Sequence, residues 1–550
     1  MSRNEMLTCL DLFCGCGGFS LGMQRAGFRV LAALDFNHEA IETYRRNFPK
    51  VPLVLSEDLT KFDPESLDKM LGRERVDVIV GGPPCQGFST ARQRDGANHG
   101  QRRFVVDPRR QLYREFLRYI AYFQPRVFVM ENVLGIKSAA GGEHFARLQA
   151  EARAIGRAAG KPGYRVQSQT EDAWELGVPQ KRRRQLIIGV RNDLPGYFPG
   201  NLEPASRARP HTNLGSAIGD LPIVRAGAGE EVCAYDMARR TNHLREFGSS
   251  ARSYLFNVLQ IARTERLTAH RARPHSARDL RDFGKLREGQ NSKEAMDKGV
   301  QFEFPYDNSS FKDRYTRQSR WEPCSTIVAH LSKDGLMFIH PTECRSLTPR
   351  EAARVQSFPD WFEFPVARTH QFRLIGNAVP PLVSEAVGIA VKSYIERARG
   401  NSKSIKFDPV LLPKDEKQAV HWLLPLLDLD KRALRGVPDD DFKRGWFSIA
   451  FLYAGLHPDS ALEHGTRVAH DAKDHALVSR VEPRLVKPYY EQSGWPVVLA
   501  PVAKEAWRRY KSGSIKDDEF YCLEAQLAGI CHRSPSLASE VRRERQDLVA

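Results

Sequence analysis

The chain has 550 residues, of which 41% are hydrophobic and 27% are charged. This is an ordinary globular composition, and the length allows about two to four domains with cores of their own. No run of about 18 or more apolar residues occurs, so we expect no membrane-spanning helix. The nine cysteines form no Cys-x-x-Cys pair, which argues for a reducing cytoplasm and against a structural metal site.

The net charge of +16 indicates an anionic partner. Residues 401–550 contain 23 Lys and Arg against 22 Asp and Glu, a net of +1, which leaves +15 on residues 1–400. We therefore expect the first 400 residues to bind a polyanion, although a basic surface alone is weak evidence because solvated arginine-rich faces are common.

The first predicted strand covers residues 7–13 and is followed by a glycine-rich turn and a helix to about Ala26, which Gly27 ends. A strand, a glycine turn and a helix form a cradle for a nucleotide-containing cofactor, because glycines let the backbone approach the ligand and the helix N-terminus offers free N–H groups. A dehydrogenase also fits this pattern. The dinucleotide motif Gly-x-Gly-x-x-Gly is absent, however, since Ser20 stands at its third glycine.

Two aspartates follow the next two predicted strands. Residues 28–34 lead to Asp35, and the apolar run 51–55 leads to Asp58. A carboxylate at the end of the second strand is the usual acceptor for ribose hydroxyls, and Asp58 is placed to accept a hydrogen bond from an adenine amino group. One such aspartate could equally cap a helix, but two at successive strand ends favour a cofactor site.

The predicted strand 76–80 leads into the sequence Gly-Gly-Pro-Pro at 81–84 and then Cys85. The glycines let the backbone turn off the strand and the prolines stiffen it. Cys85 is thereby expected at the carboxyl edge of the sheet, where open α/β folds carry their chemistry. A thiol there, with no second cysteine at redox or metal spacing, is interpreted as a nucleophile rather than as a small buried hydrophobic residue.

Charged segments follow this motif. Residues 90–110 hold six arginines and two aspartates, which suits a loop closing over a phosphate backbone, although a plain surface loop is the alternative. The strand 126–130 ends in Glu131, and the basic run 180–184 precedes a strand at 185–190. In isolation, Glu131 would be read as a helix cap or surface charge, and the basic run as a solvated face.

The remaining sequence divides into three parts. Residues 191–344 show little regular pattern and many arginines, and residues 345–398 contain a helix start at Thr348 with Glu351 in capping-box position. An apolar helix is expected up to about Tyr394. A linker near residues 400–404 then leads to a near-neutral segment with enough apolar material to fold.

Six of these segments resemble, in order, the motifs of the DNA (cytosine-5)-methyltransferases: Asp11–Phe19, Pro83–Gln86, Glu131–Val133, Gln180–Arg184, Arg345–Pro359 and Gly376–Pro381. The resemblance implies an α/β, Rossmann-like S-adenosylmethionine-dependent methyltransferase sheet with an inserted target-recognition domain. The expected parts are a catalytic and cofactor-binding domain at 1–190, a target-recognition domain at 191–344, a return to the catalytic domain at 345–398 and a C-terminal accessory domain at 399–550.

The resemblance also implies the chemistry. A methyl group passes from S-adenosylmethionine to C5 of a cytosine that is flipped out of duplex DNA within a specific sequence, through a covalent adduct of Cys85 with C6. Glu131 hydrogen-bonds the ring nitrogen N3, and Arg182 and Arg184 lie on the substrate side. The residues implied to bind the cofactor are Phe13, which packs on the adenine, Gly15, Gly17, Gly18, Asp35, Phe36, Asp58, Pro84, Leu112 and Asn377. The residues implied to contact DNA are Gln86, Ser89, Arg92, Arg94 and Thr326.

Two other functions fit parts of the sequence. One is a tRNA cytosine-5 methyltransferase. The sequence Cys324-Ser325-Thr326 faintly resembles the Cys-Phe-Thr signature of those enzymes, but the long basic region in the middle of the chain argues against this function. The other is a DNA-binding scaffold in a defence or regulatory complex, against which the intact Cys85 and Glu131 weigh. We expect a cytoplasmic, nucleoid-associated modification enzyme without a metal, and residues 401–550 could dock a restriction or phage-defence protein.

Overall fold

A computed structural model describes residues 6–84, 112–137, 143–156, 160–194, 198, 202–206, 209–304 and 315–399. Several of the predicted site residues lie outside the described residues, as does the predicted accessory domain beyond Arg399. These site residues are Cys85, Gln86, Ser89, Arg92 and Arg94.

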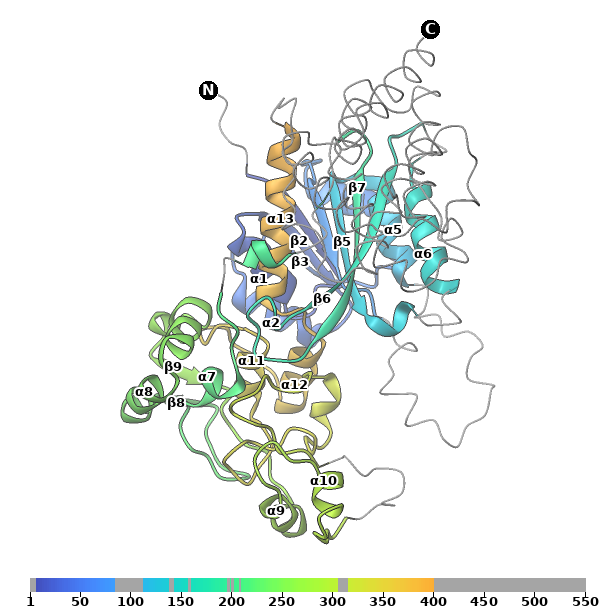
Figure 1. Ribbon diagram of the computed structural model, residues 1–550. Helices are drawn as coiled ribbons and strands as arrows, with labels where there is room; N and C mark the ends of the chain where they lie inside the picture. The colour runs from blue at the N-terminus through green and yellow to red at the C-terminus, as the bar shows by residue number, and fades with distance from the viewer. Residues whose placement is uncertain are drawn as a thin grey trace, which may run out of the picture. The chain divides into compact units, whose positions relative to one another are not determined.

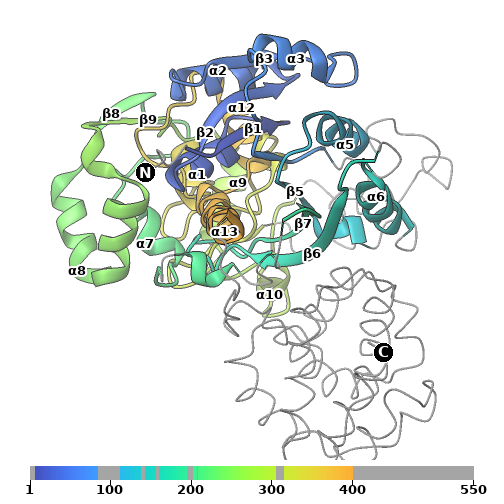
Figure 2. The same cartoon turned by 90° about the horizontal axis from the view of Figure 1, so that it is seen from above.

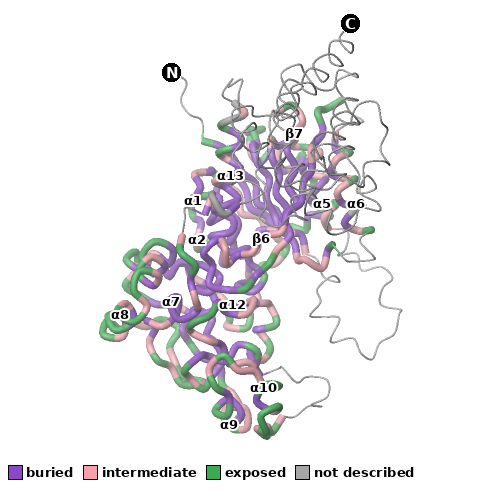
Figure 3. Tube along the Cα trace, in the orientation of Figure 1, coloured by how far each residue is buried: buried purple, intermediate pink, exposed green. Residues whose placement is uncertain are grey.

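Seven strands form one sheet in the order β3-β2-β1-β4-β5-β7-β6. Strands β1 to β5 pair in parallel with their neighbours. The residues of β1 and β4 are buried throughout, which is typical of parallel strands covered on both faces. Figure 3 shows the strands of the sheet mostly in the colour of buried residues. The strands are β1 Thr8–Leu12, β2 Arg29–Asp35, β3 Leu53–Ser56, β4 Val78–Gly81, β5 Val127–Val133, β6 Tyr164–Asp172 and β7 Arg183–Arg191. The predicted mostly parallel α/β sheet is therefore confirmed.

Helices follow the strands as the sequence predicts. They are α1 Gly18–Arg25, α2 His38–Asn47, α3 Pro64–Met70, α5 Leu112–Phe123, α6 Glu143–Ala154, α11 Pro349–Val355, α12 Arg368–Asn377 and α13 Pro381–Arg399. Helices α1 and α13 lie side by side (Figures 1 and 2). A Cβ at Gly22 would lie 2.4 Å from the Glu385 nitrogen, and one at Gly388 would lie 2.6 Å from the Ala26 Cβ. Glycine on each helix therefore permits the close approach.

The region 191–344 contains more regular structure than its sequence pattern indicates. Helices α7 Leu214–Ile218, α8 Met237–Ser253, α9 Ala277–Gly284 and α10 Ser292–Met296 accompany an antiparallel pair, β8 Val232–Ala234 and β9 Arg266–Thr268. In Figure 1 they gather below the strands. A small core of Phe283, Leu286, Ala295, Tyr315, Leu336 and Ile339 holds α9 and α10. Most of these elements are too short to show a clear apolar period in the sequence.

Packing divides the chain into two units. The first consists of Met1–Leu148, Glu171–Gln185 and Ala205–Ile389, and all site contacts described below lie within it. The second consists of Gln149–Thr170, Leu186–Pro204 and Ala390–Ala550. In its described part, Arg165 donates to the Leu194 carbonyl and the rings of Phe198 and Tyr394 pack together. The domain boundaries expected at 190, 344 and 398 stay predictions.

One helical stretch, Arg368–Glu396, is long and apolar enough to cross a membrane by length and composition. Within the protein, 89% of its most apolar window is buried. Burial of this kind is usual for a core helix, so the apolar character has a structural explanation.

Candidate active site

The segment that precedes Cys85 leaves the sheet at the end of β4. A Cβ at Gly81 would lie 2.2 Å from the Leu12 carbonyl oxygen on β1, so glycine is needed there for close strand packing. Gly81 and Gly82 both have ordinary negative φ or extended backbone, unlike the left-handed glycines elsewhere in the described chain. Packing, rather than a left-handed turn, therefore explains Gly81.

The end of the neighbouring strand β5 holds this segment in place. The Asn132 side chain donates to the Pro83 carbonyl at 3.3 Å. A Cβ at Gly82 would lie 3.7 Å from Glu131 Oε2, so the Glu131 carboxylate lies directly beside Gly82. Glu131 itself is only 9% exposed. Glu131, to which the resemblance assigns the ring nitrogen N3, thus lies beside the segment that leads to Cys85.

Arg184, at the start of β7, pairs with this carboxylate. Its Nε lies 3.1 Å from Glu131 Oε1, and both side chains are largely buried. Burial lowers the pKa of Arg184, while Glu131 opposes that change. A hydrogen-bonded ion pair inside the protein is strong and directional, because little solvent screens it there. Arg184 therefore fixes the direction in which the Glu131 carboxyl points.

Arg182 has different partners, although the sequence assigns it to the same side of the substrate. Its guanidinium donates to the Ile327 carbonyl at 2.8 Å and to the Ala378 carbonyl at 3.1 Å, and the residue is 2% exposed. Thr326, predicted to contact DNA, donates its hydroxyl to the Lys181 carbonyl. Arg182 thus hydrogen-bonds backbone carbonyls, whereas Arg184 pairs with the Glu131 carboxylate.

The turn between β1 and α1 has the shape of a ligand cradle. Phe13 has φ 57° and Gly15 has φ 54°, both left-handed, and a non-glycine residue there is uncommon and typical of functional sites. A Cβ at Gly15 would meet nothing within 4 Å, so the space above it is open. Asp35, at the end of β2, accepts from the Gly15 N–H at 2.9 Å and also from the Asn37 N–H. Burial raises the pKa of Asp35.

The other predicted cofactor residues occupy varied settings. Phe36 is 67% exposed beside Asp35. Asn377 is exposed at the end of α12, whereas Pro84 and Leu112 are half-buried. Glycines 17 and 18 serve packing, because a Cβ at Gly18 would lie 2.2 Å from the Val379 carbonyl oxygen and one at Gly17 would strike the Phe48 ring. The close approach of Gly18 to Val379 brings the loop after α12 against the turn between β1 and α1.

Asp58 differs from Asp35. It is exposed, and its Oδ1 accepts from the Thr60 N–H at 3.0 Å and from the Thr60 hydroxyl at 2.7 Å. These bonds lower the pKa of Asp58. One carboxylate oxygen therefore stabilises a turn, and Oδ2 lies 3.9 Å from Lys61 Nζ.

The sequence analysis placed Asp11 in the first motif but gave no role to this residue, which is fully buried on β1. Its Oδ2 accepts from the Ser20 N–H at 3.0 Å and the Ser20 hydroxyl at 2.6 Å, and Tyr44 donates to that hydroxyl. Its Oδ1 has no hydrogen-bond partner within the described part of the chain. Burial raises the pKa of Asp11 to about 7. A carboxylate inside an otherwise apolar strand was the available sequence signal.

A family model for C-5 cytosine-specific DNA methylases matches residues 7–393. The chain belongs to this family. The type II methyltransferase M.DdeI of Desulfomicrobium norvegicum is 35% identical over 404 residues, covering 71% of this chain and 89% of its own. M.AgeI of Thalassovita gelatinovora is 33% identical over 450 residues, covering 70% and 99%.

A solved structure described as a DNA modification methyltransferase encoded within an E. coli prophage is 27% identical, with a TM-score of 0.54, and covers 71% of this chain and 99% of its own. Together with the family match, this makes the chain a DNA (cytosine-5)-methyltransferase with a Rossmann-like sheet. The family favours this interpretation over the tRNA methyltransferase and over a DNA-binding scaffold without catalysis.

Proposed function

We propose that this methyltransferase moves a methyl group from S-adenosylmethionine to C5 of a cytosine flipped out of duplex DNA, through a covalent bond between Cys85 and C6. The observation that carries this proposal is the buried Glu131–Arg184 pair, 3.1 Å apart, beside Gly82 at the end of β4. Cys85 follows three residues later in the sequence. The adjacent ends of β4 and β5 can bring a nucleophile and an acid to the same ring.

Each residue has a defined task in this proposal. The Cys85 thiolate forms the sulfur–C6 bond, the C5–C6 π electrons move toward C5, and the Glu131 carboxyl at N3 neutralises charge on the ring. Arg184 holds that carboxyl in place. S-adenosylmethionine, when bound, would supply an electrophilic methyl group to C5 and leave as S-adenosylhomocysteine. A base such as water takes the C5 proton, and the electrons of that C–H bond re-form the C5–C6 double bond while the sulfur–C6 bond breaks, which frees Cys85. The base must leave the duplex first, because C5 and C6 are blocked inside the stack.

The β1–α1 turn suits an adenosine-containing cofactor. The open space above Gly15 would admit it, the Phe13 ring is assigned to the adenine with the exposed Phe36 ring beside Asp35, and Asp35 offers a carboxylate for ribose hydroxyls. Phe13 and Asn377 border this region from the turn and from the end of α12. We assign the cofactor to these residues, with Asp58 in a weaker role because a turn already uses one of its oxygens.

The biological setting follows from the relatives. M.DdeI and M.AgeI are type II methyltransferases, which supports a modification role alongside a restriction enzyme. We further propose that residues 191–344 read the DNA sequence, that Thr326 lies at that surface, and that residues 401–550 dock a protein partner in the cytoplasm. The basic loop predicted at 90–110, including Arg92 and Arg94, would close over the DNA backbone.

The test uses duplex DNA containing 5-fluorocytosine at the site that bisulfite sequencing identifies. Fluorine cannot leave as a proton does, so the wild type should form a complex that survives denaturation, and Cys85→Ser should form none. Glu131→Gln should bind DNA normally but methylate it at least about 100-fold more slowly, the scale of a lost general acid.

The matched control is Glu143→Gln, which changes an exposed glutamate on α6 in the same structural unit. It should methylate at the wild-type rate. Turnover by Cys85→Ser above a few per cent of wild type, or failure of the wild type to trap, would contradict the covalent route.

A further inference from the structure

Residues 324–329, which we call the recognition segment, are hydrogen-bonded along one edge to the Gln-x-Arg-x-Arg motif. Cys324 N–H donates to the Pro179 carbonyl at 2.9 Å, and Lys181 N–H donates to the Cys324 carbonyl at 2.8 Å. The Thr326 hydroxyl donates to the Lys181 carbonyl. This short parallel pairing sets the register between Thr326 and the motif.

The next residue, Ile327, has both backbone groups bound by buried side chains of the motif. Its N–H donates to Gln180 Oε1 at 3.0 Å, and its carbonyl accepts from Arg182 at 2.8 Å. Gln180 in turn donates to the Val355 carbonyl at 3.1 Å and to Gln356. The position of the recognition segment therefore depends on two side chains that are themselves fixed in the core.

The recognition segment also touches the C-terminal end of α12, which carries Asn377. A Cβ at Gly376 would lie 2.3 Å from the Val328 carbonyl carbon, so the two backbones are in contact. Arg182 donates to the Ala378 carbonyl at 3.1 Å, and Gln356 donates to the Ile375 carbonyl at 2.6 Å. One guanidinium thus holds backbone on both sides of the interface.

We propose that Gln180, Arg182 and Gln356 are positioning residues that couple DNA binding at the recognition segment to cofactor binding at residues 376–378. The inference rests on the proposed function, which assigns Thr326 to DNA and Asn377 to the cofactor. Moving either segment alone would leave a buried carbonyl or amide without its partner, which is costly. Ordering one segment therefore favours the ordered position of the other, and such coupling acts equally in both directions.

The experiment measures fluorescence anisotropy of a labelled duplex carrying the site identified by bisulfite sequencing, with and without saturating S-adenosylhomocysteine. In the wild type, S-adenosylhomocysteine should strengthen duplex binding by about fivefold or more, within the usual range for coupled sites. In Arg182→Lys this ratio should fall to about one to two, since an ammonium lacks the fixed fork that reaches two carbonyls.

The matched control is Arg317→Lys. Arg317 is also buried and donates to four backbone carbonyls, those of His340, Pro341, Glu343 and Phe283. We expect a loss of thermal stability at least as large as in Arg182→Lys, with the coupling ratio kept. A purely structural role for Arg182 predicts equal ratios in the two variants, and that result would overturn the proposal.

A wild-type ratio of one would also overturn it, whatever the variants do. If Arg182→Lys does not fold, Gln180→Glu replaces it, because glutamate keeps the acceptor for Ile327 N–H and loses the donor to Val355. A reduced ratio then supports the proposal and an unchanged ratio contradicts it. Methyl transfer by the wild type is assayed separately: its absence would contradict the proposed function, whereas intact transfer without coupling contradicts the inference about these three residues alone.

Discussion

Asp35 and Asp58 follow successive strands and look alike in the sequence, but their side chains have different tasks. Asp35 orders the cradle by accepting from Gly15 and Asn37, and we propose that its carboxylate also binds the ribose. Asp58 accepts twice from Thr60 at the surface. A strand-end aspartate can be predicted from sequence, but whether a turn uses it depends on local geometry.

We therefore expect unequal effects on S-adenosylhomocysteine binding. Asp35→Ala should weaken binding by about 1–3 kcal/mol, the cost of leaving ligand donors unpaired. Asp58→Ala should cost less than about 1 kcal/mol. Titration calorimetry measures both, and Asp63→Ala, which removes a comparable exposed side-chain cap on α3, controls for a general loss of local order. Equal losses at positions 35 and 58 would contradict this assignment.

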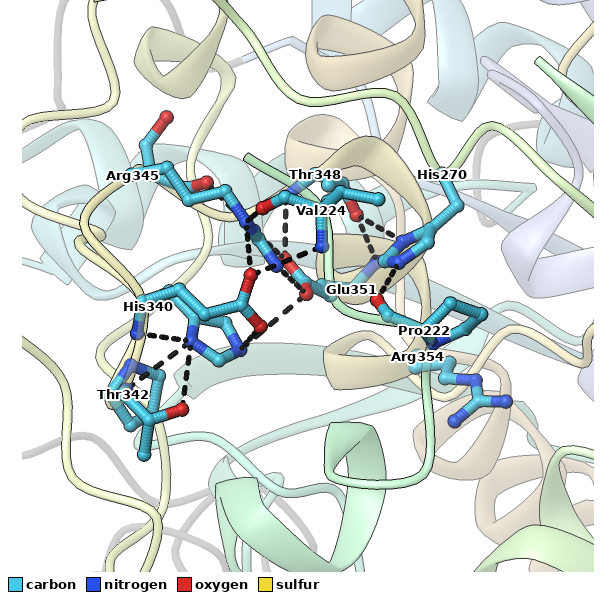
Figure 4. Close-up of polar contacts among 12 residues, drawn as sticks. Pro222, Val224, His270, His340, Thr342, Arg345, Thr348, Glu351 and Arg354 are labelled. Carbon is cyan, nitrogen blue, oxygen red and sulfur yellow. Dashed lines mark hydrogen bonds and ion pairs between the residues drawn. The ribbon is translucent and has the colours of Figure 1, made fainter. Parts of the chain in front are cut away.

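At the scale of elements, α11 is held by a buried polar cluster. Glu351 accepts from both terminal nitrogens of Arg345 at 2.8 Å and from the Thr348 N–H at 2.7 Å. His270 and His340 complete the cluster (Figure 4). Burial alone would raise the pKa of Glu351, but Arg345 and His340 outweigh it and hold that pKa well below its usual range. Burial lowers the pKa of His340 to about 3.

Both lowered pKa values make the fold sensitive to acid. The free energy of unfolding should fall as the pH drops below about 6.5, where His340 in the unfolded chain takes up a proton, and more steeply below about 4.3, where unfolded glutamate does. The stabilisation that His340 and Glu351 each give to the folded state is fully present above the pKa of the same group in the unfolded chain. Glu351→Gln should lower the melting temperature at pH 7 and flatten its fall below about pH 4.5. Melting curves between pH 3 and 8 measure this, and a variant with the wild-type slope below pH 4.5 would contradict it.

The sequence predicted the elements of this fold better than their contacts. The apolar runs predicted the five parallel strands β1 to β5, and Thr348 with Glu351 predicted the capping box that starts α11. The partners of Arg182 were not predictable, because Ile327 and Ala378 lie about 150 and 200 residues away and periodicity reports only local structure. The short helices between residues 191 and 344 were not predicted for a related reason, because long-range packing stabilises them.

In the molecule as a whole, the net positive charge and the predicted catalytic residues lie in the same part of the chain. The family match ends at residue 393, helix α13 ends at Arg399, and residues 401–550 carry only +1 of the net +16. If phosphate contacts supply most of the affinity for DNA, they should come almost entirely from residues 1–400.

A chain that ends after Arg399 should therefore keep its sequence preference and its salt-dependent DNA affinity within about tenfold of the full chain. It keeps Glu131, Arg184 and the whole of α13. Gel-shift titrations over a range of salt concentrations compare the two proteins. A well-folded truncation that loses much of its salt slope would mean that residues 401–550 touch phosphates, which contradicts the charge argument.

An unchanged slope, together with loss of a partner protein in pull-downs, would instead support docking by that segment. A truncation that fails to fold would place the domain boundary elsewhere, because the segment would then be needed to cover apolar surface of the catalytic part.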